Sequence, residues 1–259
     1  MSEQIYIGGF HAVAAALEDA AAKPVEVLLA AHRQDERSRR IAELARAASV
    51  PVQLRSKSDL DMLAPGLRHQ GVLALLPERA AASEDILEAP AGPDALVLVL
   101  DGVQDPHNLG ACLRTAEAAG ARAVVVPKDR AVGLTPVVRK AAAGAAERLP
   151  LVTVTNLART LERLKSLGYW ITGLAGEAGE SLFDVELTGP VALVLGAEGE
   201  GLRRLTKEHC DRLVRIPMGG KAESLNVSVA AAICLYETVR QRASKTLKTR
   251  APSRTMRAP

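Results

Sequence analysis

Apolar residues follow two alternating patterns along this chain, and together these patterns predict an α/β protein. From about residue 95 onward, short apolar runs typical of buried parallel strands alternate with segments of helical periodicity. The predicted strands cover residues 96–101, 123–126, 151–154, 170–174, 191–196 and 212–216. The predicted helices cover residues 109–119, 136–143, 157–166, 202–208 and 224–242. Such an alternation predicts a parallel sheet with helices on both faces.

The first part of the chain shows the same alternation on a smaller scale. Strand-like and helix-like segments follow one another and cover residues 25–30, 33–48, 52–54, 58–63 and 72–76. We therefore predict a small α/β domain over residues 1–77. Pro, Ala, Ser and acidic residues without periodicity predict a linker over residues 78–94. The larger domain follows over residues 95–243, and a basic tail, which we predict to be disordered, covers residues 244–259.

Basic residues are concentrated in two places, although the net charge of the chain is only +3. The chain has no acidic residue after Glu237, but several basic residues follow it: Arg240, Arg242, Lys245, Lys248, Arg250, Arg254 and Arg257. The small domain carries a second set: Arg33, Arg37, Arg39, Arg40, Arg55, Lys57, Arg68 and His69. Both sets fit a polyanionic partner, and both also fit an ordinary solvated surface. Aromatic residues make up only 2% of the chain, which argues against RNA binding on an aromatic stacking sheet.

The cysteine and histidine patterns argue against several classes of site. Cys112, Cys210 and Cys234 lie far apart, so we expect neither a disulfide framework nor a site of paired cysteines. The histidines show no ligand spacing, so we expect no metal. The chain has no basic region followed by an apolar core at its N-terminus, and no apolar run of membrane-spanning length. We therefore expect a soluble, cytoplasmic protein without a membrane partner.

The first junction that could carry chemistry follows the predicted strand at residues 96–101. Asn108 is placed to cap the next helix, and Arg114 falls within that helix. Two interpretations of Arg114 remain open. It could pair with Glu117 on an exposed helix face. It could instead reach a cleft and bind a phosphate group through two hydrogen bonds.

The second junction is a glycine-rich turn after the predicted strand at residues 191–196. Its glycines, Gly196, Gly199 and Gly201, have the spacing G-x-x-G-x-G rather than the dinucleotide-binding spacing G-x-G-x-x-G. Glu198 and Glu200 would also repel a pyrophosphate group. A turn with two carboxylates suits a cationic ligand or the transfer of a proton, although a tight turn with exposed acids explains it equally simply.

The third junction runs from Ile216 through Gly219 and Gly220 to Ser224, Asn226 and Ser228, which we place in the first turns of the last helix. Ser and Asn are ordinary helix-capping residues, and free N–H groups at a helix start also bind acceptor groups. All these junctions follow a predicted parallel strand. Because ligands bind beyond the carboxyl ends of such strands, we expect the junctions to meet at one edge of the sheet.

Three sequence motifs at these junctions resemble those of a known family. They read Asn108-Leu-Gly-Ala-x-x-Arg114-Thr-Ala, Leu195-Gly-Ala-Glu198-Gly-Glu-Gly and Ile216-Pro-Met-x-Gly-x-x-x-Ser224-Leu-Asn226-Val-Ser. The chain resembles the SpoU (TrmH-like) branch of the SPOUT RNA methyltransferases over residues 4–243. Within that branch it is most similar to enzymes that methylate a guanosine 2'-hydroxyl in the peptidyl-transferase loop of 23S ribosomal RNA.

The resemblance implies a fold, a cofactor and partners. It implies a small L30e-like α/β/α N-terminal domain that binds RNA, followed by a SPOUT parallel-sheet domain with a C-terminal trefoil knot. It also implies S-adenosyl-L-methionine as methyl donor without a metal, ribosomal RNA as substrate, and a homodimer that forms through the knotted domain.

The resemblance also implies the site residues. Gly196, Ile216 and Leu225 resemble the residues whose backbone holds the adenosyl group. The implied catalytic residues are Asn108, Arg114, Glu198, Ser224 and Asn226. Arg114 resembles the residue proposed in the family to activate the ribose hydroxyl. Because arginine stays protonated in proteins, we interpret its role as orienting a phosphate and stabilising the developing alkoxide.

Other functions remain as alternatives. The chain could be a tRNA ribose 2'-O-methyltransferase of the same family, or an RNA-binding protein that has kept the fold and lost catalysis. A nucleotide-dependent oxidoreductase is disfavoured by the glycine spacing. Lys221-Ala-Glu223 differs from the small neutral residues expected before Ser224, and the basic tail extends past the usual family end.

Overall fold

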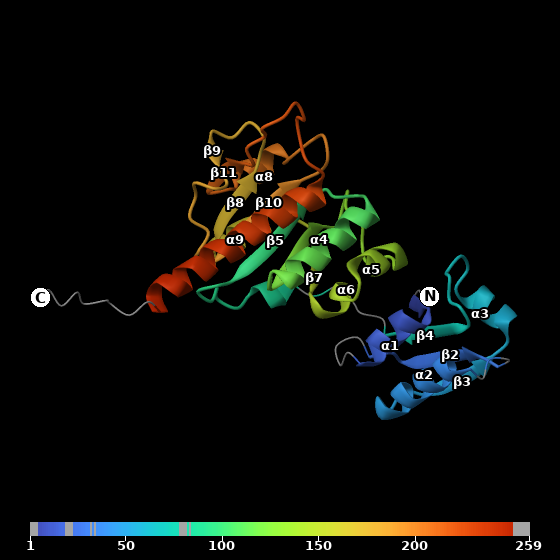
Figure 1. The fold of residues 1–259 in the computed structure, drawn as a ribbon. Helices are drawn as coiled ribbons and strands as arrows, with labels where there is room; N and C mark the ends of the chain where they lie inside the picture. Colours follow the sequence, from blue (N-terminus) through green and yellow to red (C-terminus); the bar gives the residue numbers. More distant parts are fainter. Residues whose placement is uncertain are drawn as a thin grey trace, which may run out of the picture.

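The computed structural model describes residues 5–18, 23–31, 33, 35–77, 82 and 84–250 of the chain (Figure 1). Within them the strands form two separate sheets, a four-stranded sheet from the first 76 residues and a seven-stranded sheet from the rest. The predicted α/β class, with a small N-terminal unit and a larger parallel-sheet unit, is confirmed. The trefoil knot stays a prediction.

The larger sheet contains only parallel strand pairs. Its order is β7-β6-β5-β10-β8-β11-β9, and each pair of neighbours runs in the same direction. The strands are β5 (Leu96–Asp101), β6 (Ala123–Pro127), β7 (Leu151–Val154), β8 (Trp170–Leu174), β9 (Glu180–Ser181), β10 (Val191–Gly196) and β11 (Arg212–Arg215). Of these, only the two-residue β9 was not predicted from the apolar runs. Strands buried on both faces carry continuous apolar runs, which made them recognisable.

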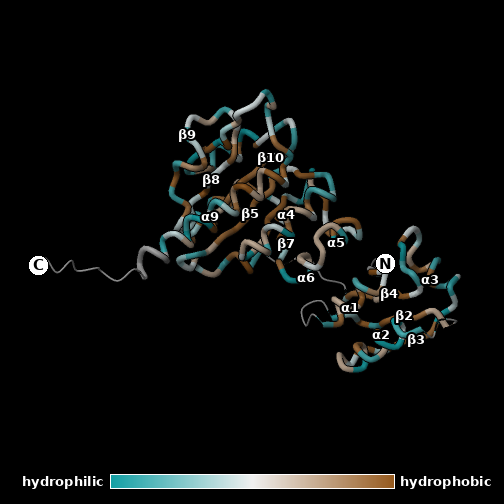
Figure 2. Tube along the Cα trace, viewed as in Figure 1, coloured by the Kyte–Doolittle hydropathy of each residue, from teal (hydrophilic) through white to brown (hydrophobic). Residues whose placement is uncertain are grey.

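Helices cover both faces of this sheet. One face packs against α4 (Pro106–Ala118), α5 (Pro136–Ala142), α6 (Ala145–Arg148) and α9 (Val227–Arg250), with α4 and α9 side by side in Figure 1. The other face packs against α7 (Leu157–Ser166), with α8 (Arg204–Glu208) beside it. Within β5, Leu98 contributes to the first core and Val99 to the second, and both are fully buried. The apolar strands therefore lie between two layers of helices, and Figure 2 shows strands β5 and β10 in brown, the colour of hydrophobic residues.

The smaller sheet is mixed. Its order is β1-β4-β2-β3, where β1 (Ile5–Gly8) and β2 (Glu26–Ala30) run antiparallel to β4 (Val72–Leu76), and β3 (Val52–Arg55) runs parallel to β2. One face packs against α1 (Phe10–Glu18) and α2 (Glu36–Ala47), and the other against α3 (Lys57–Leu63). The sequence did not predict β1 or α1 as separate elements. The edge strand β3 is exposed along its length.

The second half of the predicted linker packs onto the larger unit. Residues 84–87 form a 3-10 helix, η1 (Glu84–Leu87), and Leu87 is buried in the core that α7 covers. Arg122 supports this segment by donating hydrogen bonds to the carbonyl oxygens of Ile86 and Ala89. The segment before the first strand of the larger sheet is therefore part of that unit's structure.

Helix boundaries differ from the prediction at two functional junctions. Helix α4 begins at Pro106 with Asp105 as its N-cap, so the prediction that Asn108 caps this helix is wrong. Proline at the first helical position suits a helix start because no backbone N–H is needed there. Helix α9 begins at Val227, so Ser224 and Asn226 precede it rather than lying in its first turns.

The end of the chain also differs from the prediction. Helix α9 continues to Arg250, beyond the predicted end at residue 242 and into the segment predicted as a disordered tail. Residues 251–259 of that tail lie outside the described residues. No helix among the described residues is long and apolar enough to cross a membrane.

Candidate active site

Three of the polar residues predicted to carry chemistry, Asn108, Glu198 and Asn226, meet at the carboxyl ends of β5, β10 and β11. Strands β5 and β10 are adjacent and in register, with Asp101 opposite Gly196 at their ends. The segments that follow these strands contain Asn108 and Glu198, and the segment after β11 contains Asn226. The prediction that these junctions lie at one edge of the sheet is confirmed.

Asn108, Glu198 and Asn226 form one hydrogen-bonded cluster. Asn108 Nδ2 donates to Glu198 Oε1 at 2.7 Å, and Asn226 Nδ2 donates to the same oxygen at 3.0 Å. Asn226 Nδ2 also donates to Asn108 Oδ1 at 3.0 Å. The carboxylate thus receives two amide donors, and hydrogen bonds to an ionised group are stronger than those between neutral groups. The side chains from three distant segments hold one another in place.

Asn226 has a second role at the start of α9. Its Oδ1 accepts hydrogen bonds from the backbone N and the Oγ of Ser228, at 2.9 and 2.6 Å. Its carbonyl oxygen accepts from the backbone N of Ala230 at 2.9 Å. These are the contacts of an N-cap residue, which satisfies donors that the first turn leaves unpaired. The same side chain therefore positions α9 and donates to Glu198.

The Glu198 turn depends on a close backbone approach at Gly196. A Cβ atom on Gly196 would lie 2.0 Å from the carbonyl carbon of Gly201, a distance at which no side chain fits. Gly199 and Gly201 also have φ angles of 79° and 66°, in the left-handed region that glycine adopts without strain. The turn therefore folds directly back on the end of β10, which carries the Glu198 side chain toward Asn108.

A large cleft of about 960 Å³ lies beside this turn. It contains all three residues predicted to hold the adenosyl group and three of the predicted catalytic residues: Gly196, Glu198, Ile216, Ser224, Leu225 and Asn226. Leu174, Leu195 and Met218 add apolar surface, while Glu198 and Glu200 add carboxylates. Small-molecule sites combine apolar surface with polar groups at defined places, and this cleft has both, with Lys207 and Arg215 as further charged residues.

Arg114 is the predicted site residue that does not join this group. It is exposed on α4 and lies among the lining residues of neither this cleft nor the smaller cavity beside it. Glu117, its alternative partner in the sequence, accepts instead from Arg148 Nε at 2.7 Å. The catalytic role of Arg114 stays a prediction.

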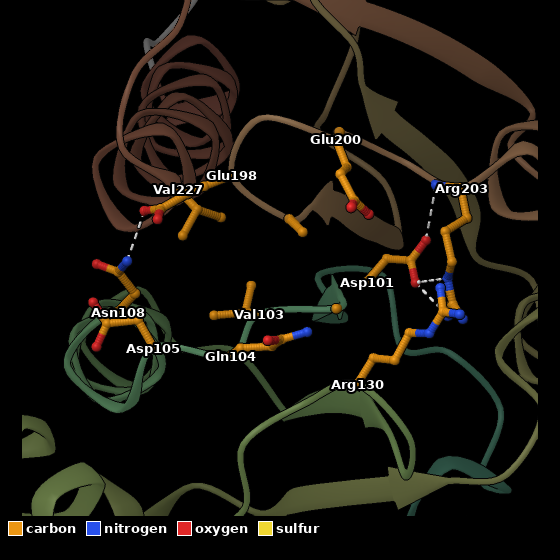
Figure 3. Close-up of a pocket in the computed structure, with 13 residues that line it drawn as sticks. Asp101, Val103, Gln104, Asp105, Asn108, Arg130, Glu198, Glu200, Arg203 and Val227 are labelled. Atoms are coloured by element: carbon orange, nitrogen blue, oxygen red, sulfur yellow. Dashed lines mark hydrogen bonds and ion pairs between the residues drawn. The ribbon is translucent and has the colours of Figure 1, made fainter.

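The smaller cavity, of about 370 Å³, is lined by Asp101, Gln104, Arg130 and Arg203, which are not among the predicted site residues (Figure 3). Asp101 at the end of β5 is buried and accepts from Arg203 Nε at 2.6 Å and from the Arg203 backbone N at 3.1 Å. Gln104, Arg130 and Glu200 also line this cavity. One sequence signal marked this region, an aspartate at the end of an apolar strand. Its partner Arg203 is 102 residues further along the chain, so the pair could not be found from local pattern.

Cys112 lies close to the site without taking part in its chemistry. Burial raises the pKa of its thiol to about 12, and the charge of Glu198 acts in the same direction. The thiol therefore stays protonated near neutral pH and is not a nucleophile. Among the described residues, no group of three or more His, Cys, Asp or Glu side chains could hold a metal ion.

Comparison with known proteins shows the family. Residues 95–236 match the model of the SpoU rRNA Methylase family, and residues 6–80 match the model for RNA 2'-O ribose methyltransferase substrate binding. The chain belongs to the SpoU rRNA methylase family. The first matched region contains the larger sheet, and the second contains the smaller sheet except for Ile5.

Individual relatives match nearly the whole chain. A 23S rRNA (guanosine-2'-O-)-methyltransferase RlmB from Bordetella pertussis is 52% identical over 244 residues, covering 93% of this chain and 99% of that protein. Among solved structures, the SpoU methyltransferase AviRb from Streptomyces viridochromogenes in complex with AdoMet has a TM-score of 0.78 at 27% identity, covering 93% of this chain and 91% of that chain. An RNA 2'-O ribose methyltransferase has a TM-score of 0.73 at 33% identity, covering 93% and 90%.

Proposed function

We propose that this protein transfers the methyl group of S-adenosyl-L-methionine to the ribose 2'-hydroxyl of a guanosine in 23S ribosomal RNA. Relatives with this reaction in their names are about half identical to the chain over nearly its full length. The observation that carries the proposal is the Asn108–Glu198–Asn226 cluster at the wall shared by the two cavities. This arrangement offers one place for the methyl donor and one for the methyl acceptor.

The residues of the larger cleft fit S-adenosyl-L-methionine. Its apolar residues, such as Leu174, Leu195 and Met218, suit an adenosyl group, and the glycine at position 196 lets the turn close against the end of β10 and form a wall of the cleft. The carboxylates of Glu198 and Glu200 complement a cationic ligand. Gly196, Ile216 and Leu225 would hold the adenosyl group, as the family resemblance implies. When bound, S-adenosyl-L-methionine supplies an electrophilic methyl group on a sulfonium centre.

The residues of this chain contribute mainly by positioning. A sugar hydroxyl is a weak acid, so its proton must leave as the oxygen attacks. Asn108, Glu198 and Asn226 are held by their mutual hydrogen bonds, which limits the orientations open to a hydroxyl placed against them. Ser224 is exposed in the same cleft and offers a hydroxyl group. Arg114 would orient the target phosphate and stabilise the developing alkoxide.

The α9 surface supports the proposal of a homodimer. Val229 and Tyr236 are 47% and 50% exposed, and the half-buried Ile233 lies between them on the same helix face. An exposed apolar stripe of this kind suits a protein interface. Sedimentation of the purified protein should give a dimer, and Val229→Lys together with Tyr236→Lys should give a monomer.

A ribosomal RNA substrate would also place the protein in the cytoplasm.

The reaction can be tested with labelled S-adenosyl-L-methionine and transcripts of 23S ribosomal RNA and tRNA. We expect label in a single guanosine 2'-O position of the 23S transcript, and its loss with Asn226→Ala and with Arg114→Ala. Label only in tRNA would keep the chemistry and overturn the substrate. Binding of cofactor and RNA without any label would favour a non-catalytic RNA-binding protein.

A further inference from the structure

The smaller cavity, lined by Gln104, Arg130, Glu200 and the Asp101–Arg203 pair, has no role in the reaction described so far. Its volume of about 370 Å³ falls in the range of small-molecule sites, about 300–1,000 Å³. It shares Glu198, Glu200 and Gly201 with the cofactor cleft, so the two spaces lie on either side of one turn. A group bound here would lie next to the Asn108–Glu198–Asn226 cluster.

Most charged groups around this cavity already have partners. Asp101 is paired with Arg203, Glu198 accepts from two asparagine side chains, and Asp105 accepts from the backbone N of His107 at 2.8 Å. Within the part of the chain that the structure describes, no hydrogen bond or ion pair is made by the side chains of Glu200 and Arg130. Both residues line the cavity, and Figure 3 shows the guanidinium of Arg130 beside that of Arg203, close to Asp101, with Glu200 on the other side of the cavity.

The backbone of Arg130 supports a functional role for this arrangement. Its φ angle is 59°, in the left-handed region that residues with a side chain adopt rarely. Such conformations cost free energy and concentrate at ligand-binding sites. Arg130 is the third residue after the end of β6. Its guanidinium therefore lies at the same edge of the sheet as the catalytic cluster.

A carboxylate and a guanidinium that line one cavity match the hydrogen-bonding groups on the edges of guanine. Guanine has acceptors at O6 and N7, which an arginine binds through two hydrogen bonds, and donors at N1 and N2, which a carboxylate accepts. Adenine has an acceptor at N1 instead, which Glu200 would repel. Enzymes that act on single-stranded or flipped nucleotides read their target base by its Watson–Crick edge in this way.

We propose that this cavity holds the base of the target guanosine, with Glu200 accepting from N1 and N2 and Arg130 donating to O6 and N7. This inference rests on the proposed function. The ribose of the bound nucleoside then lies at the wall that the two cavities share, where Glu198 faces the cofactor cleft. Glu200 and Arg130 are specificity-determining residues for the known reaction of the family, and Glu198 keeps the positioning role.

The experiment uses 23S ribosomal RNA transcripts that carry guanosine, inosine or 7-deazaguanosine at the methylated position. Inosine lacks the N2 amino group, and 7-deazaguanosine lacks the N7 acceptor. For the wild-type protein, each replacement should lower kcat/KM about 10- to 100-fold, the effect of losing a hydrogen bond to a charged group. Glu200→Ala should react equally with guanosine and inosine but still discriminate against 7-deazaguanosine. Arg130→Ala should show the converse pattern.

Controls separate this contact from other effects. Glu84→Ala removes an exposed acid from η1 and should keep the full wild-type discrimination. Calorimetric titration should give the same S-adenosyl-L-methionine affinity for Arg130→Ala and the wild type, and Glu200→Ala is compared at saturating S-adenosyl-L-methionine because Glu200 also lines the cofactor cleft. Equal discrimination by Glu200→Ala and the wild type would overturn the base contact while leaving the reaction intact. Absence of methylation of any 23S transcript by the wild type would overturn the proposed function and this inference together.

Discussion

The two sheets of this protein place their functional surfaces in different ways. The larger sheet is wholly parallel, and its interior strand β5 is buried along its whole length. The smaller sheet is mixed, and its edge strand β3 is exposed along its whole length. Parallel strands point all their carboxyl ends toward one edge, so the larger sheet gathers polar residues into a cleft. The smaller sheet instead offers an extended outer surface.

This contrast indicates that the larger unit carries the reaction chemistry and the smaller unit contributes to RNA binding. The carboxyl edge of the larger sheet carries residues that hold one another by hydrogen bonds of 2.7–3.0 Å, and such fixed positions suit reaction chemistry. The exposed β3 strand carries Arg55 beside Leu54, and Lys57 follows at the start of α3. Such a surface suits a backbone contact with RNA, which needs positive charge more than exact geometry. Changes in the two units should therefore affect different steps.

The largest effect on activity should come from Glu198→Gln. The amide that replaces the carboxylate leaves the two asparagine donors without a common charged acceptor, so the cluster loses its arrangement. We expect kcat to fall by about 100-fold or more, because misplacement of reacting groups has effects of this size. Single-turnover methylation measures the loss. Filter binding should give unchanged RNA affinity, and a matching fall in RNA affinity would contradict the division between the units.

The next effect concerns stability. Leu98→Ala removes a fully buried side chain from the centre of the larger sheet, and we expect a loss of about 2–5 kcal/mol in the free energy of unfolding. Leu54 is 67% exposed on β3, and Leu54→Ala should change this free energy by less than about 0.5 kcal/mol. Urea denaturation followed by circular dichroism compares the two. Similar losses would show that β3 is covered in solution.

Gly196→Ala should weaken cofactor binding. The added methyl group would lie 2.0 Å from the Gly201 backbone, so the turn must move and reshape the wall of the cleft. Overpacking of this kind costs about 1–3 kcal/mol, which corresponds to a loss of roughly 5- to 150-fold in affinity. Isothermal titration calorimetry with S-adenosyl-L-methionine measures this loss of affinity. Gly189→Ala is the matched control, because a Cβ at that position meets nothing within 4 Å.

The smallest effect should follow the removal of charge from the smaller unit. Arg55→Ala combined with Lys57→Ala should weaken RNA binding a few-fold and lower the slope of log affinity against log salt by about 2, one for each lost phosphate contact. Cofactor affinity should stay unchanged. Arg159→Ala on α7 removes an exposed charge from the larger unit as a comparison. An unchanged salt slope in the double variant would place the RNA contact elsewhere.

Much of the larger unit could be predicted from local pattern. Strand β5 has the predicted bounds because its run of buried aliphatic residues ends at a charged residue, Asp101. The helix starts were less accurate. Asn108 resembled a cap, but Asp105 followed by Pro106 competes for that role and begins the helix three residues earlier. A capping residue is predicted from the residues around it. Where two candidate caps lie close together, the packing of the folded protein decides which one begins the helix.

The sequence by itself determined the α/β class, the parallel sheet and the edge at which the functional loops lie, because these follow from hydrophobic period and chain direction. The tertiary structure alone decided which side chains meet. Asn108 and Asn226 are 118 positions apart, and only the folded sheet brings both within 3.0 Å of Glu198 Oε1. It also left Arg114 outside the cluster and placed Glu200 and Arg130 on the lining of one cavity. Such contacts depend on packing between distant segments, which local patterns do not encode.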